Sequence, residues 1–258
     1  MKKISIFAAL VVLFLYAGLI ISIFYFLDAT TLQEALSSKR VLFALKLSLL
    51  SATIASLLAI IIAIPAGYAL SRFEFKSKEL INTLLEFPMV VSPAALGAII
   101  LIFFNNPLGE WISQNIYNFI FTFAGIILAQ FITVLGVSVR FIKSAFDEVD
   151  IELENMARVL GANSFYVFKK VTLPLAKRGL IGAFILTWAK ALGEFGATLT
   201  VAGTMPFKTE TLPIAIYMHL EVADIKTTAA LIFILIFFGL GALFLTRWLL
   251  SRGLDDRV

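Results

Sequence analysis

Residues 154–174 read ENMARVLGANSFYVFKKVTLP and lie between two long apolar segments. Small and apolar side chains recur there at i, i+3, i+4 and i+7, the spacing of one helix face: Leu153, Met156, Ala157 and Leu160. The other faces carry polar residues: Glu152, Glu154, Asn155 and Arg158. Gly161 follows as a typical C-terminal stop. The pattern predicts a short amphipathic helix. It could insert into the groove of a soluble partner or rest on lipid headgroups or its own bundle.

Composition indicates a membrane protein. The chain is 60% hydrophobic with a mean hydropathy of +0.98, and residues 4–27 and 231–246 contain no charge. A membrane-spanning helix needs about 20 apolar residues. We therefore predict an all-α membrane protein with about six transmembrane helices in one domain over residues 1–258. The spans are expected near residues 4–27, 41–70, 82–104, 119–139, 179–201 and 227–249. The first is too long for the apolar part of a signal peptide and is interpreted as a retained anchor.

Basic residues predict the orientation. If the N-terminus is cytoplasmic, only five of the 21 Lys and Arg residues fall in outer segments: Lys39, Arg40, Lys46, Lys208 and Lys226. Lys190 lies within a span, and the others gather at the inner boundary. Both termini and the loop at about residues 140–178 are thus expected in the cytoplasm of a multi-pass protein of the cell membrane. The net charge of +4 reflects this topology and gives no reason to expect nucleic-acid binding.

Several chemistries find no support in the residues. The chain has no cysteine, its one histidine is His219, and no His/Asp/Glu group has metal-ligand spacing. No phosphate-binding Gly-x-x-x-x-Gly-Lys motif occurs, and no glycine is followed by lysine. If ATP powers this protein, another chain must hydrolyse it.

Prolines interrupt two predicted spans. Pro88 and Pro93 remove backbone donors from the third span, and Ser92 with small neighbours makes this segment narrow. Broken helices at membrane depth are tolerated where they face protein or a water-filled path. The alternative is a plain proline kink. Pro65 in the second span is interpreted as a kink near the cytoplasmic end.

The fifth predicted span carries two charges and many small residues, which let helices approach closely. Lys190 and Glu194 are four residues apart and would share one helix face, with Thr198 one turn further on. A charge near the bilayer centre costs about 2.5–3.5 kcal/mol on insertion scales, so it usually faces an interior or a cavity. Two interpretations stay open. The charges could form a self-neutralising pair that packs the bundle, or they could line a pathway or gate.

The spacing of residues 155–174 resembles the EAA loop of ABC-importer permeases: E-A-A, three residues, G, nine residues, I-x-L-P. Asn155, Met156 and Ala157 take the E-A-A positions, and Gly161, Val171, Leu173 and Pro174 take the later ones. Asn155 thus replaces the motif glutamate, with Glu154 just before it. The resemblance implies a type I permease fold in which this loop is the coupling helix that inserts into the ATPase subunit. The implied coupling residues are Leu153, Glu154, Asn155, Met156, Ala157, Arg158, Leu160, Gly161, Leu173 and Pro174.

A second segment narrows the resemblance. The run ALGEFGAT at residues 191–198, followed by Val-Ala-Gly at 201–203, is similar to the molybdate/tungstate permeases and more distantly to the sulfate permeases. The implied function is import of a tetrahedral oxyanion, with molybdate or tungstate favoured and sulfate as the alternative. The candidate pathway or gate residues, from the broken third span and the charged fifth span, are Ser92, Pro93, Lys190, Glu194 and Thr198. Thr198 would offer its hydroxyl to a passing anion.

The resemblance also implies partners. These are two ATP-binding cassette subunits carrying ATP and Mg²⁺, a second copy of this chain, an extracytoplasmic oxyanion-binding protein and the lipid bilayer. No cofactor is expected in this chain, and the outer segments 28–40 and 202–226 could meet the binding protein or be solvated connections. Two other classes of membrane protein are less well matched by the residues. A secondary transporter would need ion-coupling groups beyond Lys190 and Glu194, and a membrane-embedded enzyme would need a nucleophile with a base or a carboxylate pair.

Overall fold

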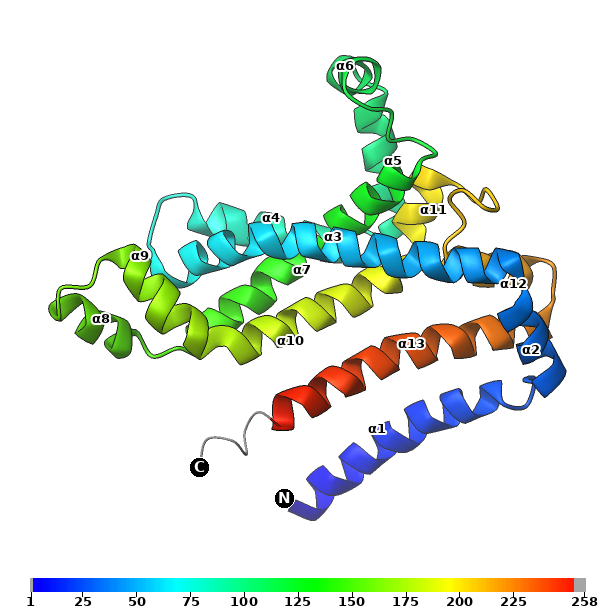
Figure 1. The fold of residues 1–258 in the computed structure, drawn as a ribbon, viewed down its shortest axis with the longest axis horizontal. Helices are drawn as coiled ribbons and strands as arrows, with labels where there is room; N and C mark the ends of the chain where they lie inside the picture. The colour runs from blue at the N-terminus through cyan, green and yellow to red at the C-terminus, as the bar shows by residue number, and fades with distance from the viewer. Residues whose placement is uncertain (1, 253–258) are drawn as a thin grey trace.

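The computed structural model describes residues 2–252, with the side chains of residues 3–244, and all regular secondary structure within this part is helical (Figure 1). The inner basic residues Arg247, Arg252 and Arg257 lie outside the described side chains. The long helices are α1 (Lys2–Ile23), α3 (Lys39–Arg72), α7 (Phe123–Asp147), α10 (Leu173–Leu192) and α13 (Ile225–Arg252). Shorter ones are α2 (Ala29–Ser37), α4 (Lys78–Val90), α5 (Pro93–Phe104), α6 (Pro107–Asn115), α8 (Ile151–Val159), α9 (Ser164–Val167), η1 (Phe168–Thr172), α11 (Gly196–Ala202) and α12 (Leu212–Glu221).

Five of the described helices are long and apolar enough to cross a membrane, and a sixth span results if the bent pair α4 and α5 counts as one. The prediction of about six transmembrane helices is confirmed. The boundaries shift by several residues. The fourth span, expected at 119–139, begins at Phe123 and continues to Asp147, and Pro65 lies inside the single helix α3.

Helices α3, α7 and α10 pack against one another at the centre of the bundle. The buried face of α3 contains a stripe of small residues at helical spacing: Ala44, Ser48, Ala52, Ala55, Ala59, Ala63 and Gly67. Small side chains allow the helix backbones to approach closely. This matters inside a membrane, because burial of apolar surface contributes little to helix association there. A Cβ at Gly67 would lie 2.8 Å from Cγ2 of Ile142 on α7, so this approach depends on the glycine.

Side-chain hydrogen bonds also join the central helices. The Ser138 and Thr187 hydroxyls lie 3.0 Å apart between α7 and α10, and Trp188 Nε1 donates to Thr53 Oγ1 of α3 at 3.0 Å. In a bilayer such bonds contribute about 0.6–2 kcal/mol each. Together with the small-residue stripe they make the three helices one unit.

The third and fifth spans are both broken. The axes of α4 and α5 meet at an angle of 111°, and Ser92 between them is extended, with ψ of 149°, as expected for a residue before proline. The prediction that the fifth span is one continuous helix over residues 179–201 was wrong. Helix α10 ends at Leu192, and α11 begins at Gly196.

The long helices run across Figure 1, with α8 and α9 at one end of the molecule and α2 and α12 at the other. Helix α1 begins and α13 ends toward the side of α8, while α5 and α6 project away from the central helices. The connecting segments with α2 and with α8 thus lie at opposite ends, whereas the one with α6 lies apart from both.

Candidate functional site

Helix α8 spans Ile151–Val159, and the predicted amphipathic helix is confirmed. The Asp150 side chain caps its first turn by accepting from the Glu152 amide at 2.9 Å. Gly161 ends it with a φ of +89°. The Gly161 amide donates to the Arg158 carbonyl and the Ala162 amide to the Ala157 carbonyl, the two bonds of a Schellman motif. The predicted role of Gly161 as the stop is therefore confirmed.

One face of α8 is apolar and open. Met156 is 55% exposed, and Val159 and Leu160 are each 87% exposed. With Glu152 and Asn155 they line a shallow hollow of about 480 Å³ on the outer side of the helix. We call Met156, Val159 and Leu160 the exposed patch of α8. Sequence periodicity missed Val159, although an apolar residue beside the predicted stripe was a signal for it.

Leu153 lies away from this patch. It lines a second hollow, of about 350 Å³, together with Leu175 and Arg178 from α10 and residues that end α7. Ala157 is half-buried. The predicted stripe is therefore divided: Met156 and Leu160 face outward, and Leu153 faces the membrane helices.

Glu154 is fully buried, which sequence reasoning missed. Its Oε1 atom accepts from Arg72 Nε at 2.9 Å and from Thr172 Oγ1 at 3.0 Å, and Oε2 lies 3.4 Å from Arg158 Nη2. The Glu154 carboxylate thus points into the permease and is not part of the outer surface of α8. No local sequence signal marked it, because Glu152 two residues earlier is of the same type and is exposed.

Asn155, at the place of the motif glutamate, lies exposed on α8, and its Oδ1 accepts from Arg158 Nη1 at 2.9 Å. Leu173 and Pro174 begin α10 after the π-helical turn η1. Pro174 has no N–H to donate to the Lys170 carbonyl, and a wider turn accommodates this loss. The turn also brings Thr172 beneath α8.

The two breaks in the membrane helices lie together, because α11 packs against α5. A Cβ at Gly196 would lie 2.9 Å from the Ala94 amide nitrogen and 3.1 Å from Cβ of Pro93. A Cβ at Gly97 would lie 2.7 Å from Cβ of Thr200. The glycines therefore permit a contact that no larger residue would allow at this backbone separation.

The predicted pathway residues do not all meet at this contact. Ser92 caps α5 by accepting from the Ala95 amide at 3.3 Å, and Pro93 touches α11. Glu194 is 5% exposed and accepts from the Ala197 amide at 2.9 Å, so its carboxylate caps the first turn of α11. Thr198 is buried, and its hydroxyl has no hydrogen-bond partner in the described part of the chain.

Lys190 differs from the others because it is exposed on α10. Since α10 ends two residues later, Lys190 and Glu194 do not occupy i and i+4 of one helix. No direct ion pair joins them among the described residues. The interpretation as an intrahelical pair is corrected, because Gly193 ends the helix between them.

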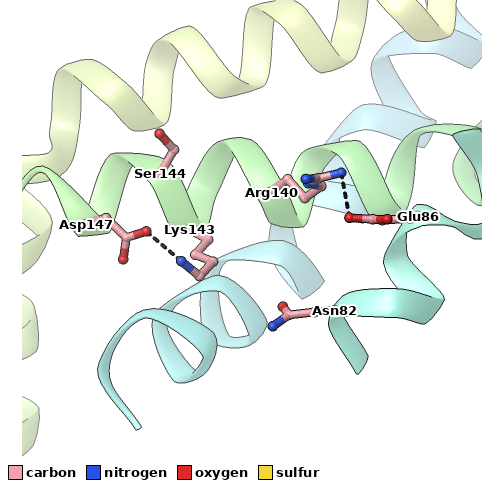
Figure 2. A pocket seen from close by; sticks show the side chains of 6 residues that line it. All are labelled: Asn82, Glu86, Arg140, Lys143, Ser144 and Asp147. Atoms are coloured by element: carbon pink, nitrogen blue, oxygen red, sulfur yellow. Dashed lines mark hydrogen bonds and ion pairs between the residues drawn. The ribbon is translucent and has the colours of Figure 1, made fainter. Parts of the chain in front are cut away.

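A polar cavity of about 370 Å³ lies between α4 and α7 near the end that leads to α8 (Figure 2). Arg140 Nη1 lies 3.3 Å from Glu86 Oε1, and Lys143 Nζ lies 2.6 Å from Asp147 Oδ2, as the dashed lines of Figure 2 mark. Asn82 and Ser144 complete its lining. Each basic group is matched by a carboxylate, so the cavity carries no net charge. One of the ion pairs, Arg140 with Glu86, joins α7 to α4, whereas Lys143 and Asp147 both lie on α7.

The fold is that of ABC-importer permeases. The chain is similar to the MetNI methionine ABC transporter in inward-facing conformations, with a TM-score of 0.66 at 17% identity over 83% of this chain and 98% of that one. It is also similar to a bacterial alginate ABC transporter in complex with its periplasmic protein, with a TM-score of 0.75 at 14% identity over 95% and 92% of the two chains. Residues 55–253 match the family described as binding-protein-dependent transport system inner membrane component, and the chain belongs to this family.

Sequence relatives agree with the family. The molybdenum transport system permease protein of Haemophilus influenzae is 32% identical over 213 residues, which cover 81% of this chain and 93% of the relative. The molybdate/tungstate transport system permease protein of Thermococcus kodakarensis is 28% identical over 87% of this chain and 85% of the relative. The sulfate transport system permease protein of Escherichia coli K12 is 29% identical over 85% and 80%. The chain is thus a multi-pass membrane component of an ABC importer.

Proposed function

We propose that this chain is the permease subunit of an importer that carries a tetrahedral oxyanion, molybdate or tungstate, into the cytoplasm. The substrate assignment rests on the names of the molybdenum and molybdate/tungstate relatives. The single structural observation that carries the transport role is the exposed patch of α8 above a carboxylate that is fully buried. An apolar patch on a fixed helix suits a groove on a soluble partner better than it suits solvent.

The partner at α8 is an ATP-binding cassette subunit that carries ATP and Mg²⁺. Two such subunits would serve two copies of this chain, and a binding protein would deliver the anion at the opposite end. The chain itself contributes no ATPase motif and acts as a transport subunit without catalysis. Apolar side chains left open on α4 and α5 suit contact with the second copy: Leu84, Met89, Val90 and Ile102, exposed by 60% or more.

The loop with α8 and both termini are assigned to the cytoplasm. The excess of basic residues at that boundary supports this orientation. We assign the route of the anion to the region where α5 meets α11. Discontinuous membrane helices often line transport routes, because unpaired backbone groups at a break are tolerated only beside protein or water. Thr198 is the residue assigned to hydrogen-bond the anion, since its buried hydroxyl has no protein partner among the described residues.

The experiment measures uptake of radioactive molybdate by vesicles that contain the permease, its ATPase and its binding protein. Met156→Asp should abolish uptake and weaken retention of the ATPase, because a charge placed in a desolvated groove costs several kcal/mol unless it is paired. Leu36→Asp is the matched control: Leu36 is 46% exposed on α2, at the opposite end of the molecule. This variant should retain the ATPase. Wild-type uptake in Met156→Asp would remove the docking assignment.

Sulfate is the second candidate substrate, and the similarity to the Escherichia coli sulfate permease favours it. Competition in the same vesicles separates the candidates. Excess tungstate should suppress molybdate uptake, whereas excess sulfate should leave it unchanged. Loss of uptake with a protonophore while ATP is held constant would instead favour a secondary transporter and contradict the proposal.

A further inference from the structure

Arg72, the last residue of α3, lies at a junction of three segments. Its side chain is only 7% exposed, and Nη2 donates to the carbonyls of Phe146 and Val149 at 2.8 Å each. Nε donates to Glu154 at 2.9 Å, and Nη1 donates to Ser71 Oγ at 2.9 Å. One guanidinium thus binds the end of α7, the start of the coupling loop and the buried carboxylate of α8.

Glu154 depends on this guanidinium. Its carboxylate is fully buried, and its remaining donors are the Thr172 hydroxyl and a longer contact from Arg158. Without Arg72, the buried Glu154 carboxylate would keep only Arg158, at 3.4 Å, as a cation, and much of its charge would be uncompensated. Glu154 and Arg72 are therefore expected to move together. Helix α8 is therefore fastened to the ends of α3 and α7 by a charged link rather than by apolar packing.

The membrane helices to which Arg72 connects α8 form a rigid unit. Helix α3 packs closely along α7 and α10 through its stripe of small residues. Close-packed interiors transmit strain because they have few voids in which a displacement can be absorbed. A shift of α8 would therefore reach the central helices through Arg72.

We propose that Arg72 is a positioning residue that transmits movement of α8 to the membrane helices α3 and α7. This inference rests on the proposed function, because it takes α8 as the element that the ATPase moves. Arginine suits the role because its planar group offers several donors in fixed directions, whereas lysine offers a single point of charge. Three of its donor contacts hold the guanidinium against Ser71 and the end of α7, and the fourth, to Glu154, connects it to α8.

The first test needs only the permease in detergent and measures hydrogen exchange. In Arg72→Gln, amides of residues 151–160 should exchange about tenfold faster or more, because local opening of α8 costs less once the link is lost. Amides of α13 should be unchanged. Arg40→Gln is the matched control, since Arg40 pairs with buried Glu210 near the other end of α3. This control should leave α8 exchange unchanged. Wild-type exchange of α8 in Arg72→Gln would overturn the inference.

The second test measures uptake and ATP hydrolysis together in reconstituted vesicles. Arg72→Gln should retain the ATPase, because the exposed patch of α8 is intact. The number of anions moved per ATP should fall about tenfold, within the range of coupling energies between distant sites. An unchanged ratio would overturn the inference. Failure of Met156→Asp to affect uptake would instead remove the proposed docking itself, so the two failures are distinguishable.

A double variant separates positioning from simple stability. Arg72→Leu with Glu154→Leu leaves no buried charge unpaired, since Arg158, which also contacts Glu154, is 38% exposed. Its thermal midpoint should therefore recover relative to Arg72→Gln. Anions moved per ATP should stay low, because the directional link is still missing. Recovery of both quantities would show that the pair only supports the fold.

If Arg72→Gln does not accumulate in membranes, the same tests can be made with Thr172→Val. It removes one donor to Glu154, should raise α8 exchange and lower the ratio to a smaller extent, and overturns the inference if both stay at wild-type values.

Discussion

Gly196 at the start of α11 lies directly against Pro93 at the start of α5. A Cβ at position 196 would be 3.1 Å from Cβ of Pro93 and 2.9 Å from the Ala94 amide nitrogen. The two proline- and glycine-containing breaks, about 100 residues apart in the sequence, are thus parts of one contact. Separation of α5 from α11 would be the direct way to change the shape of the bundle at this point.

Gly196→Ala is expected to disrupt this contact. The added methyl group meets backbone atoms that cannot rotate away, so overpacking should cost about 1–3 kcal/mol. We expect a lower thermal midpoint in detergent and reduced uptake. Gly182→Ala is the matched control, because a Cβ at Gly182 meets nothing within 4 Å. An unchanged midpoint in Gly196→Ala would show that α5 and α11 are not in close contact.

Glu194 is expected to act first as a cap. Glu194→Gln keeps an oxygen that can accept from the Ala197 amide, whereas Glu194→Ala removes it and should cost about 0.5–2 kcal/mol more. Because Lys190 is exposed and not on the same helix as Glu194, Lys190→Gln and Glu194→Gln should lower stability additively, within about 0.5 kcal/mol. Thermal unfolding of the singles and the double measures this. A double variant more stable than Glu194→Gln alone would restore the ion-pair interpretation.

Gly161 is expected to matter through its backbone alone. Its φ is +89°, and a Cβ there would meet nothing within 4 Å, so substitution strains the chain without a clash. A left-handed conformation costs a residue with a Cβ about 1–2 kcal/mol, and a branched one more. Gly161→Val should redirect the segment toward Pro174 and reduce retention of the ATPase, while Gly161→Asn should be milder. Equal retention in both variants and wild type, measured by co-purification, would contradict this.

Arg40 and Glu210 form a bidentate pair, with Nε and Nη2 donating at 2.7 and 2.6 Å. Glu210 is 1% exposed but Arg40 is 41% exposed, so water screens part of the interaction. Arg40→Gln should therefore cost about 1–3 kcal/mol, below the value for a fully buried pair. Adding Glu210→Gln should recover part of the loss in thermal unfolding, because no charge is then left buried. Simple additivity of the two losses would show that the pair contributes nothing.

Local rules explain which features were predictable. The apolar spans, the amphipathic α8, its stop at Gly161 and the break before Pro93 all depend on neighbours within a few residues, and the structure has each of them. The break at Gly193 was not expected, because a glycine and a charge can occur within a continuous membrane helix. The Glu194 side chain stabilises the break by accepting a hydrogen bond from the first turn of α11.

The sequence by itself determined the class of fold, the number of spans and the segment that forms α8, because hydropathy and periodicity act along the chain. Only the tertiary structure decided that Glu154 turns inward to Arg72, 82 residues away, while Val159 turns outward. It also decided that Pro93 meets Gly196. The physical reason is common to these cases. The packing of helices from distant parts of the chain determines which side of a helix is buried and which cation pairs with a carboxylate. A local sequence pattern does not contain this information.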